Sequence, residues 1–283
     1  MTSPIRPPAV AGRFYPDRPQ ELLRDIREYI AQPQTAPAAG RALAAEPSCI
    51  SAFGCVVPHA GYIYSGRIAG AVFSRIEIPE HCVILCPNHT GFGVRLATMA
   101  ATRWKTPLGE VAPSITFASQ LIGSFPLLEE DSAAHRAEHA IEVQLPFLQV
   151  RQANLHIVPI AVGTSDFGVL CGLGEALANG IAASPDRPLI IASSDMNHYE
   201  SDAITRVKDR KAIERVLALD AAGLFEVVMR EKISMCGFGP AIVMLTAAQK
   251  LGATSATLID YATSADVSGD FARVVGYAGI VVE

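Results

Sequence analysis

The chain has 283 residues, of which 50% are hydrophobic and 18% are charged. It is long enough to bury a substantial core, and this composition excludes a disordered or fibrous protein. The formal net charge is -5 and no basic stripe is present, so we expect no binding to nucleic acid.

No apolar run approaches the ~18 residues of a membrane span, and residues 1–8 lack the apolar region of a signal peptide. We therefore expect a cytoplasmic protein without membrane contact. In a chain of this size the absence of a tight repeated cysteine spacing argues against a disulfide framework. All of the cysteines except Cys236 are expected to be small core residues: Cys49, Cys55, Cys82, Cys86 and Cys171.

The N-terminal part of the chain is predicted to be an arm, a helix and a loop. Residues 5–15 hold two prolines and a glycine and cannot form a helix interior, so they are expected to be extended. Asp17 can cap the helix that follows, whose apolar residues recur at helical spacing. Residues 32–48 are rich in Ala and Pro without periodicity, which predicts a flexible surface loop.

From residue 50 onward, apolar strands alternate with helical patterns. This alternation predicts a single α/β domain over residues 1–283 with a central, mostly parallel sheet flanked by helices. Strands are expected at 50–57, 82–87, 155–162, 189–194, 256–261 and 275–282. Helices are expected at 65–76, 114–123, 167–181, 203–217, 221–230 and 239–251. The apolar stretch 95–101 is expected to pair with a strand before Trp104, and residues 131–146 to form a helix or a loop leading into one.

Polar side chains follow several of these apolar runs in turns that contain glycine. His59, His89 and Cys236 lie in such turns, and Asp195 and His198 follow the strand 189–194. Ligands of open α/β sheets bind beyond the carboxyl ends of the strands, so these side chains are expected to meet there. Two histidines and one anionic donor can form an open metal site of the facial-triad type. A single histidine in a turn is more often structural, and Asp195 can equally be a cap or turn residue.

Other motifs in the chain are weaker. The segment from His135 to His139 matches the H-x-x-E-H pattern of certain zinc proteases, but Pro146 leaves little room for a long metal-binding helix, and His135 is expected to be exposed. Ser193 and Ser194 lack a Gly-x-Ser-x-Gly elbow and are interpreted as turn hydroxyls. No phosphate-binding glycine loop is present.

Six motifs in order give the chain a resemblance to a known family. They are Ala-Val-Ala-Gly-Arg-Phe-Tyr-Pro at 9–16, Pro-His-Ala-Gly-Tyr-Ile-Tyr-Ser-Gly at 58–66, Pro-Asn-His-Thr-Gly at 87–91, Glu-His-Ala-Ile-Glu-Val-Gln-Leu-Pro-Phe-Leu at 138–148, Ser-Ser-Asp-Met-Asn-His at 193–198, and a C-terminal set spanning 261–279. The sequence resembles the Memo family, whose bacterial and archaeal members are called AmmeMemoRadiSam system protein B. That family is similar to the catalytic subunit of class III extradiol ring-cleaving dioxygenases.

The resemblance implies a set of roles for the pocket residues. His59 and His89 match the histidine ligands of iron(II), and Cys236 stands where the dioxygenases have a carboxylate ligand. His198 matches the catalytic base, and His139 is the second pocket histidine. A thiolate ligand also makes copper or zinc acceptable. The family's system name implies companions with an Ammecr domain and of the radical SAM type.

Three functions follow from these observations. The first is a non-haem iron oxidoreductase of the dioxygenase type acting on a phenolic or related small molecule, in which Asp195 orients His198 and His198 takes a proton. The second is an adaptor that binds metal or a peptide without turnover. The third is a cysteine-dependent hydrolase with Cys236 as nucleophile and His198 as base.

Overall fold

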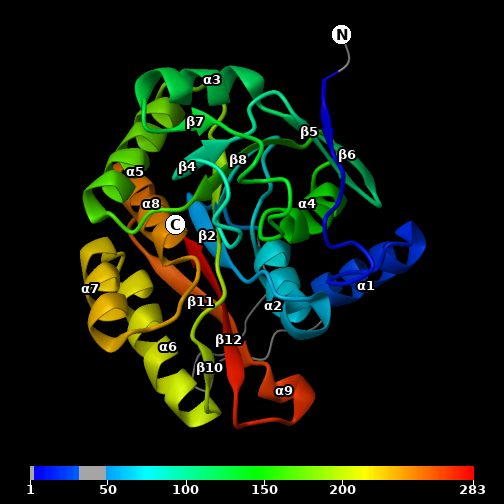
Figure 1. Cartoon of the computed structure of the whole chain (residues 1–283), viewed down its shortest axis with the longest axis vertical. Coiled ribbons are helices and arrows are strands. Elements are labelled where there is room, and N and C mark those ends of the chain that lie inside the picture. Colours follow the sequence, from blue (N-terminus) through cyan, green and yellow to red (C-terminus); the bar gives the residue numbers. More distant parts are fainter. Residues whose placement is uncertain (1–2, 32–48) are drawn as a thin grey trace.

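The computed structural model describes residues 3–31 and 49–283. Within these ranges the strands join into one mixed sheet with helices on both faces (Figure 1). The strands are β1 (Ile5–Arg6), β2 (Gly54–Val57), β3 (His81–Pro87), β4 (Leu96–Thr98), β5 (Arg103–Thr106), β6 (Gly109–Pro113), β7 (Glu129–Glu130), β8 (His156–Val162), β9 (Leu189–Ser193), β10 (His198–Glu200), β11 (Ala256–Thr263) and β12 (Val274–Val282). The helices are α1 (Pro19–Ala31), α2 (Tyr62–Arg75), α3 (Ile115–Ser124), α4 (Leu145–Arg151), α5 (Phe167–Ala182), α6 (Asp202–Leu217), α7 (Ala221–Glu231), α8 (Phe238–Lys250) and α9 (Ala265–Ser268).

The centre of the sheet is parallel. Strands β8, β3, β9 and β2 lie side by side in that order and all run in one direction. Strand β12 then pairs antiparallel with β2, and β10 and β11 both pair antiparallel with β12. Parallel neighbours end at the same edge, so the turns that follow β2, β3 and β9 meet there.

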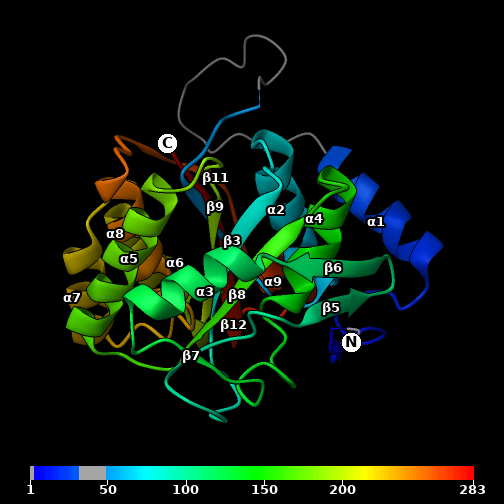
Figure 2. The ribbon, with the colours of Figure 1, turned by 90° about the horizontal axis from the view of Figure 1, so that it is seen from above.

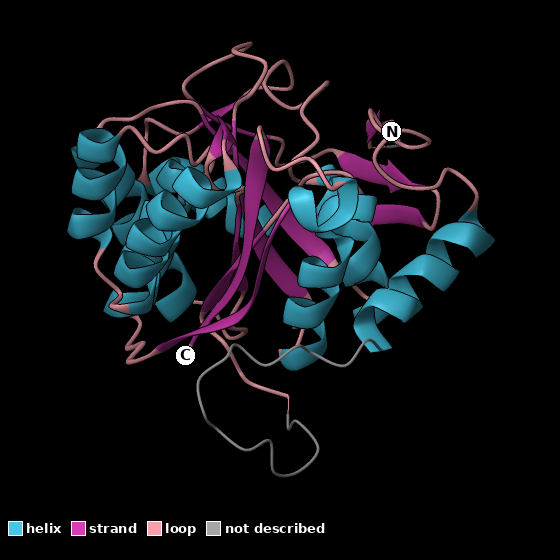
Figure 3. Cartoon of the chain, turned by 90° about the horizontal axis from the view of Figure 1, so that it is seen from below, coloured by secondary structure: helices cyan, strands magenta, loops and turns pink. Residues whose placement is uncertain are grey.

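Two hydrophobic layers hold the helices on the sheet. Successive side chains of a strand point to opposite faces, and in β2 Val56 packs towards α5 and α8 while Cys55 and Val57 pack towards α1, α2 and α4. Figure 2 shows these two groups of helices on opposite sides of the strands, and Figure 3 shows the same layers from below. Continuous apolar runs such as that of β3 are buried on both faces, as expected for parallel strands.

Small residues allow α1 and α2 to approach closely. A Cβ added at Gly66 or Gly70 of α2 would lie 2.7 Å or 2.6 Å from atoms of Tyr29 on α1. These glycines therefore serve the contact between two helices.

The predicted α/β alternation is confirmed, and its boundaries are refined. The strand expected at 50–57 begins at Gly54, because residues 50–53 lie outside the sheet apart from an isolated bridge at Ile50. Strand β4 pairs with β8 and β7, and not with the strand that holds Trp104, which belongs to the β5–β6 hairpin. Residues 131–141 are a loop that leads through a short 3-10 helix (Glu142–Gln144) into α4.

Two further expectations concern exposure and membranes. Cys49 is exposed and is not a core residue, whereas Cys55, Cys82 and Cys86 are buried. None of the helices in the described ranges has the length and apolar character needed to cross a membrane. The loop predicted at 32–48 lies outside the described residues.

Candidate metal site

A pocket of about 580 Å³ lies at the edge where the parallel strands end. Aromatic side chains from three separate segments form part of its wall: Phe14, Tyr199 and Tyr277. All the site residues expected from the sequence also line it: His59, His89, His139, Asp195, His198 and Cys236. The expectation that the strand ends gather these side chains is therefore correct.

His59 follows β2 and is held on two sides. Its backbone N–H donates to Asp195 Oδ1 at 2.7 Å, and its ring Nδ1 lies 3.0 Å from Ser193 Oγ. Burial and the charges of the neighbouring histidines lower its pKa well below the usual value. The ring is therefore neutral near pH 7, which is the form that binds a metal ion.

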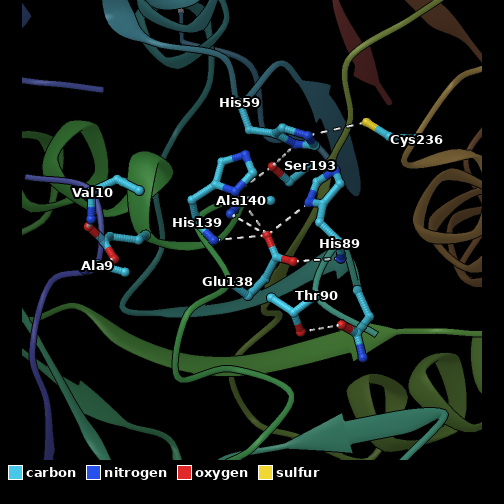
Figure 4. Close-up of polar contacts among 12 residues, drawn as sticks. Ala9, Val10, His59, His89, Thr90, Glu138, His139, Ala140, Ser193 and Cys236 are labelled. Carbon is cyan, nitrogen blue, oxygen red and sulfur yellow. Dashed lines mark hydrogen bonds and ion pairs between the residues drawn. The ribbon is translucent and has the colours of Figure 1, made fainter. Parts of the chain in front are cut away.

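Glu138 organises the other two histidines (Figure 4). Its Oε1 lies 2.9 Å from His89 Nδ1 and 3.3 Å from His139 Nδ1. The same oxygen accepts hydrogen bonds from the backbone N–H groups of His139 and Ala140. Its Oε2 accepts the His89 backbone N–H at 2.7 Å. Burial alone would raise the pKa of Glu138, but the hydrogen bonds and charge of His89 outweigh it and lower the pKa. The carboxylate is therefore ionised and fixes both rings.

The three histidine rings converge. One ring nitrogen from each of His59, His89 and His139 lies within 4.8 Å of the others. Because Glu138 holds Nδ1 of His89 and His139, and Ser193 holds Nδ1 of His59, Nε2 is the atom that each ring has left to coordinate an ion. A metal-bound histidine commonly has its other ring nitrogen fixed in this way.

Cys236 lies beside this cluster, two residues before α8. Its Sγ is 3.2 Å from His59 Nε2 (Figure 4) and accepts a hydrogen bond from the backbone N–H of Asp195, with 3.3 Å between nitrogen and sulfur. Burial and the nearby Asp195 carboxylate raise the pKa of the thiol, although hydrogen bonds oppose this. In the absence of a metal ion the thiol is therefore protonated, which is the opposite of what a cysteine nucleophile requires.

Asp195 and His198 make different contacts from those expected. Among the described residues, Asp195 holds the His59 turn, and His198 Nδ1 contacts the backbone carbonyl of Ser234 at 2.9 Å. The expected orientation of His198 by Asp195 has no hydrogen bond to support it. Burial raises the pKa of Asp195 to about 7 despite the hydrogen bond from His59. Burial also lowers the pKa of His198, so this ring is neutral at pH 7.

The H-x-x-E-H pattern does not form a metal-binding helix. His135 is completely buried, in contrast to the exposure expected for it, and its Nε2 lies 3.0 Å from the carbonyl of Ala97. Its ring packs edge-on to Trp104, away from the pocket. Only Glu138 and His139 of this pattern take part in the site, so the zinc protease interpretation is wrong.

Ser193, the last residue of β9, and Ser194 after it are structural, as expected. Ser193 Oγ donates a hydrogen bond to the carbonyl of Ala140 at 2.7 Å and accepts one from Gln144 Nε2 at 2.9 Å. It therefore joins β9 to the loop that carries His139. Ser194 Oγ accepts the backbone N–H of Gly237 at 3.0 Å and thereby holds the turn that contains Cys236. A Cβ at Gly237 would lie only 2.4 Å from Ser193 O, so this close approach requires glycine.

Sequence reasoning missed two residues that organise the site. Glu138 was recognised only as part of a motif, and Ser234 had no signal beyond its position two residues before Cys236. The glutamate directly before a pocket histidine was the available signal, since metal-binding histidines often have carboxylate partners.

Together, these features define an α/β protein with a histidine cluster and a cysteine in a pocket at the carboxyl edge of its parallel strands. The family model described as "Memo-like protein" matches residues 6–281. A MEMO1 family protein of Methanopyrus kandleri is 43% identical over 281 residues, covering 98% of each chain. One from Methanosarcina barkeri is 41% identical over 280 residues, covering 99% of this chain and 100% of its own length. The chain belongs to the Memo family.

The residues of the pocket fit a bound transition metal. Imidazole nitrogen suits iron, copper and zinc, and a thiolate ligand adds the anionic charge that a divalent ion favours. Bonds of about 2.1 Å to nitrogen and 2.3 Å to sulfur place two neighbouring ligand atoms of one ion roughly 3 to 3.5 Å apart. The 3.2 Å between His59 Nε2 and Cys236 Sγ agrees with this spacing.

Proposed function

We propose that the protein is a metal-dependent oxidoreductase of the non-haem iron type, related to the extradiol dioxygenases. The observation that carries the proposal is the convergence of His59, His89 and His139 within 4.8 Å, beside Cys236, in an open pocket. A structural metal site has four protein ligands and is closed, whereas a pocket of about 580 Å³ leaves space for a substrate beside the ion.

We propose His59, His89 and Cys236 as the ligands and iron(II) as the ion. Two neutral imidazoles and one anionic ligand resemble the facial triads of non-haem iron sites. Iron(II) bound there would supply reversible one-electron chemistry and a Lewis-acid centre. His139 then lies beside the ion as the second pocket histidine, where it contacts the substrate.

The protein's own groups would handle the proton of a phenolic or related substrate. His198 is neutral and lines the pocket, so it can accept a hydroxyl proton. Asp195 positions His59 through the backbone, and Phe14 and Tyr277 provide apolar walls that exclude water from the bound ring. Association with Ammecr-domain and radical SAM companions remains a proposal that rests on the family resemblance.

Elemental analysis of anaerobically purified protein tests the metal site. The set comprises wild type, His89→Ala, Cys236→Ala, His139→Ala and, as a matched control, His156→Ala, which removes a histidine outside the pocket. We expect near-stoichiometric iron in wild type and His156→Ala, its loss in His89→Ala and Cys236→Ala, and its retention in His139→Ala.

Each contrary outcome has a definite meaning. Loss of iron in His139→Ala with retention in Cys236→Ala would make the three histidines the ligand set. Copper or zinc in place of iron would overturn the proposed ion and, for zinc, the redox chemistry. Absence of metal from wild-type protein after metal supplementation would overturn the proposed function and leave the adaptor and hydrolase hypotheses. If iron is present, dioxygen uptake with a panel of phenols tests the reaction.

A further inference from the structure

The orientation of His198 depends on Ser234, which lines the pocket, and on Asn197, which does not. Its Nδ1 lies 2.9 Å from the carbonyl oxygen of Ser234, and its backbone N–H donates to Ser234 Oγ at 2.8 Å. A carbonyl can only accept a hydrogen bond, so this contact favours the neutral tautomer that carries its proton on Nδ1. Nε2 is then the unprotonated nitrogen, and it is the atom available to take a proton in the pocket.

Ser234 is in turn held by Asn197, the residue directly before His198. Asn197 Oδ1 accepts both the backbone N–H and the Oγ–H of Ser234, each at 3.1 Å. These two hydrogen bonds connect the loop before α8 to the loop after β9. They therefore determine where the Ser234 carbonyl lies relative to the His198 ring.

Asn197 is itself fixed by its remaining polar atoms. It is completely buried, and its Nδ2 donates to Glu200 Oε2 at 2.7 Å and to Thr205 Oγ1 at 3.3 Å. Its backbone N–H donates to Asp209 Oδ1 at 2.8 Å, and its carbonyl accepts Gly276 N–H at 3.0 Å. A buried amide with all of its groups paired has one stable orientation, and the amide cannot rotate without breaking several hydrogen bonds.

The backbone after Asn197 shows that this loop is constrained. Tyr199 has φ of 63°, a left-handed conformation that is unfavourable for a residue other than glycine. Such a conformation persists only where the surrounding contacts determine it. The loop that carries His198 is thus held in one conformation by its contacts with α6, β12 and the segment before α8.

We propose that Asn197 is the positioning residue of His198 and that, through Ser234, it selects the Nδ1–H tautomer so that Nε2 is the basic atom in the pocket. The inference rests on the proposed function only in giving His198 the role of proton acceptor. The tautomer itself is a property of the protein with or without a bound ion.

Nuclear magnetic resonance of the full-length chain labelled with ¹⁵N-histidine tests this inference near pH 8, where imidazoles are neutral. Any iron is first exchanged for zinc, and His198→Gln assigns the resonances. In wild-type protein we expect His198 to be predominantly the Nδ1–H tautomer. A wild-type His198 that is predominantly Nε2–H would overturn the inference at once.

Variants then identify the residue that selects the tautomer. Asn197→Ala removes the hydrogen bonds to Ser234, and the Nε2–H form is expected to become the major one. Thr205→Val is the matched control, because it removes a buried contact of Asn197 on the side away from Ser234. In this control the His198 tautomer is expected to stay as in wild type. An equal change of the His198 tautomer in Asn197→Ala and Thr205→Val would show a general loosening of the loop and overturn the inference.

A second substitution at the same position keeps the test available. If Asn197→Ala does not fold, Asn197→Ser replaces it, because the shorter side chain cannot accept both hydrogen bonds from Ser234, and an unchanged tautomer there would overturn the inference. Metal content measured on the same samples tests the proposed function separately.

Discussion

Glu138 is a buried carboxylate that does not line the pocket, and yet it fixes the rings of two pocket histidines. Burial would lower the pKa of His89, but the hydrogen bond and charge of Glu138 outweigh it and raise that pKa. The same carboxylate lies 3.3 Å from His139 Nδ1. Glu138 therefore increases the basicity of the rings and holds their Nε2 atoms towards His59.

Glu138→Gln is expected to weaken metal binding by about 10- to 100-fold, because an amide cannot supply the charge that orients and polarises the two rings. The dissociation constant for zinc, measured by competition with a chromophoric chelator, provides the test. Glu129→Gln in the exposed strand β7 is the control and should bind as wild type does. Equal affinities for all three proteins would show that Glu138 does not support the site.

The thiol of Cys236 gives a second test at this scale. Since burial raises its pKa, we expect metal-free protein near neutral pH to react with iodoacetamide at Cys236 at least about tenfold more slowly than at the exposed Cys49. Mass spectrometry of peptides after timed labelling measures both rates in one sample. Rapid modification of Cys236 would instead support the hydrolase hypothesis.

Among the elements, the N-terminal segment is joined to the loop of Glu138 and His139 by a buried ion pair. Arg6 in β1 contacts Glu142 at 2.6 Å and donates to the carbonyls of His135 and Glu138. Glu142 also accepts the backbone N–H groups of Ala9 and Val10 and the hydroxyl of Tyr15. The segment thus holds one side of the site, and its Phe14 packs on His139 with 4.8 Å between ring centroids.

Glu142→Gln is expected to lower the free energy of unfolding by about 3–5 kcal/mol, because the Arg6 guanidinium would remain buried without its counter-charge. Urea denaturation monitored by circular dichroism gives this value. The control is Glu110→Gln, which breaks a 2.9 Å ion pair with Arg103 between partly exposed side chains and should cost less than about 1 kcal/mol. Similar losses in the two variants would refute the anchoring role.

The elements that could be predicted from sequence are those with a strong local pattern. The buried strands β3, β8 and β9 and the helices of the second half have continuous or periodic apolar residues. The β5–β6 hairpin and the short strands β1, β7 and β10 were missed because so few residues show no period. The burial of His135 was likewise invisible, since it depends on Ala97 and Trp104 from distant segments.

The site followed the same rule. Residues in turns after apolar runs, such as His59 and His89, could be expected to meet because the topology of parallel strands brings their carboxyl ends together. The partners of those residues could not be found in this way. Whether His198 contacts Asp195 or Ser234 depends on the relative placement of two loops, which no local pattern encodes.

At the scale of the whole molecule, buried carboxyl groups make stability depend on pH. Burial raises the pKa of Asp209 on α6 to about 7, although hydrogen bonds from Asn197 and Tyr261 oppose this. An unfolded aspartate has a pKa of about 3.9, so the folded protein binds the proton more tightly. The resulting stabilisation is complete below about pH 4 and is lost as the pH rises through about 7.

The amide in Asp209→Asn cannot titrate. Between pH 5 and pH 8 the free energy of unfolding of this variant is therefore expected to fall less than that of wild type, and the difference should be on the order of 1–3 kcal/mol. Urea midpoints at the two pH values provide the comparison, with the exposed Asp270→Asn as control. Parallel pH profiles for Asp209→Asn and wild type would show that Asp209 is ionised throughout this range.

The position of β12 has a consequence for how the chain is synthesised. This strand, at residues 274–282, pairs with β2, β10 and β11, and its neighbour β2 ends at Val57, more than two hundred residues earlier. A ribosome adds roughly 5–20 residues per second, so the edge of β2 stays without its antiparallel neighbour for at least about ten seconds during translation. The nascent chain therefore carries an open strand edge until β12 emerges, and a chaperone that shields that edge would raise the yield of native protein.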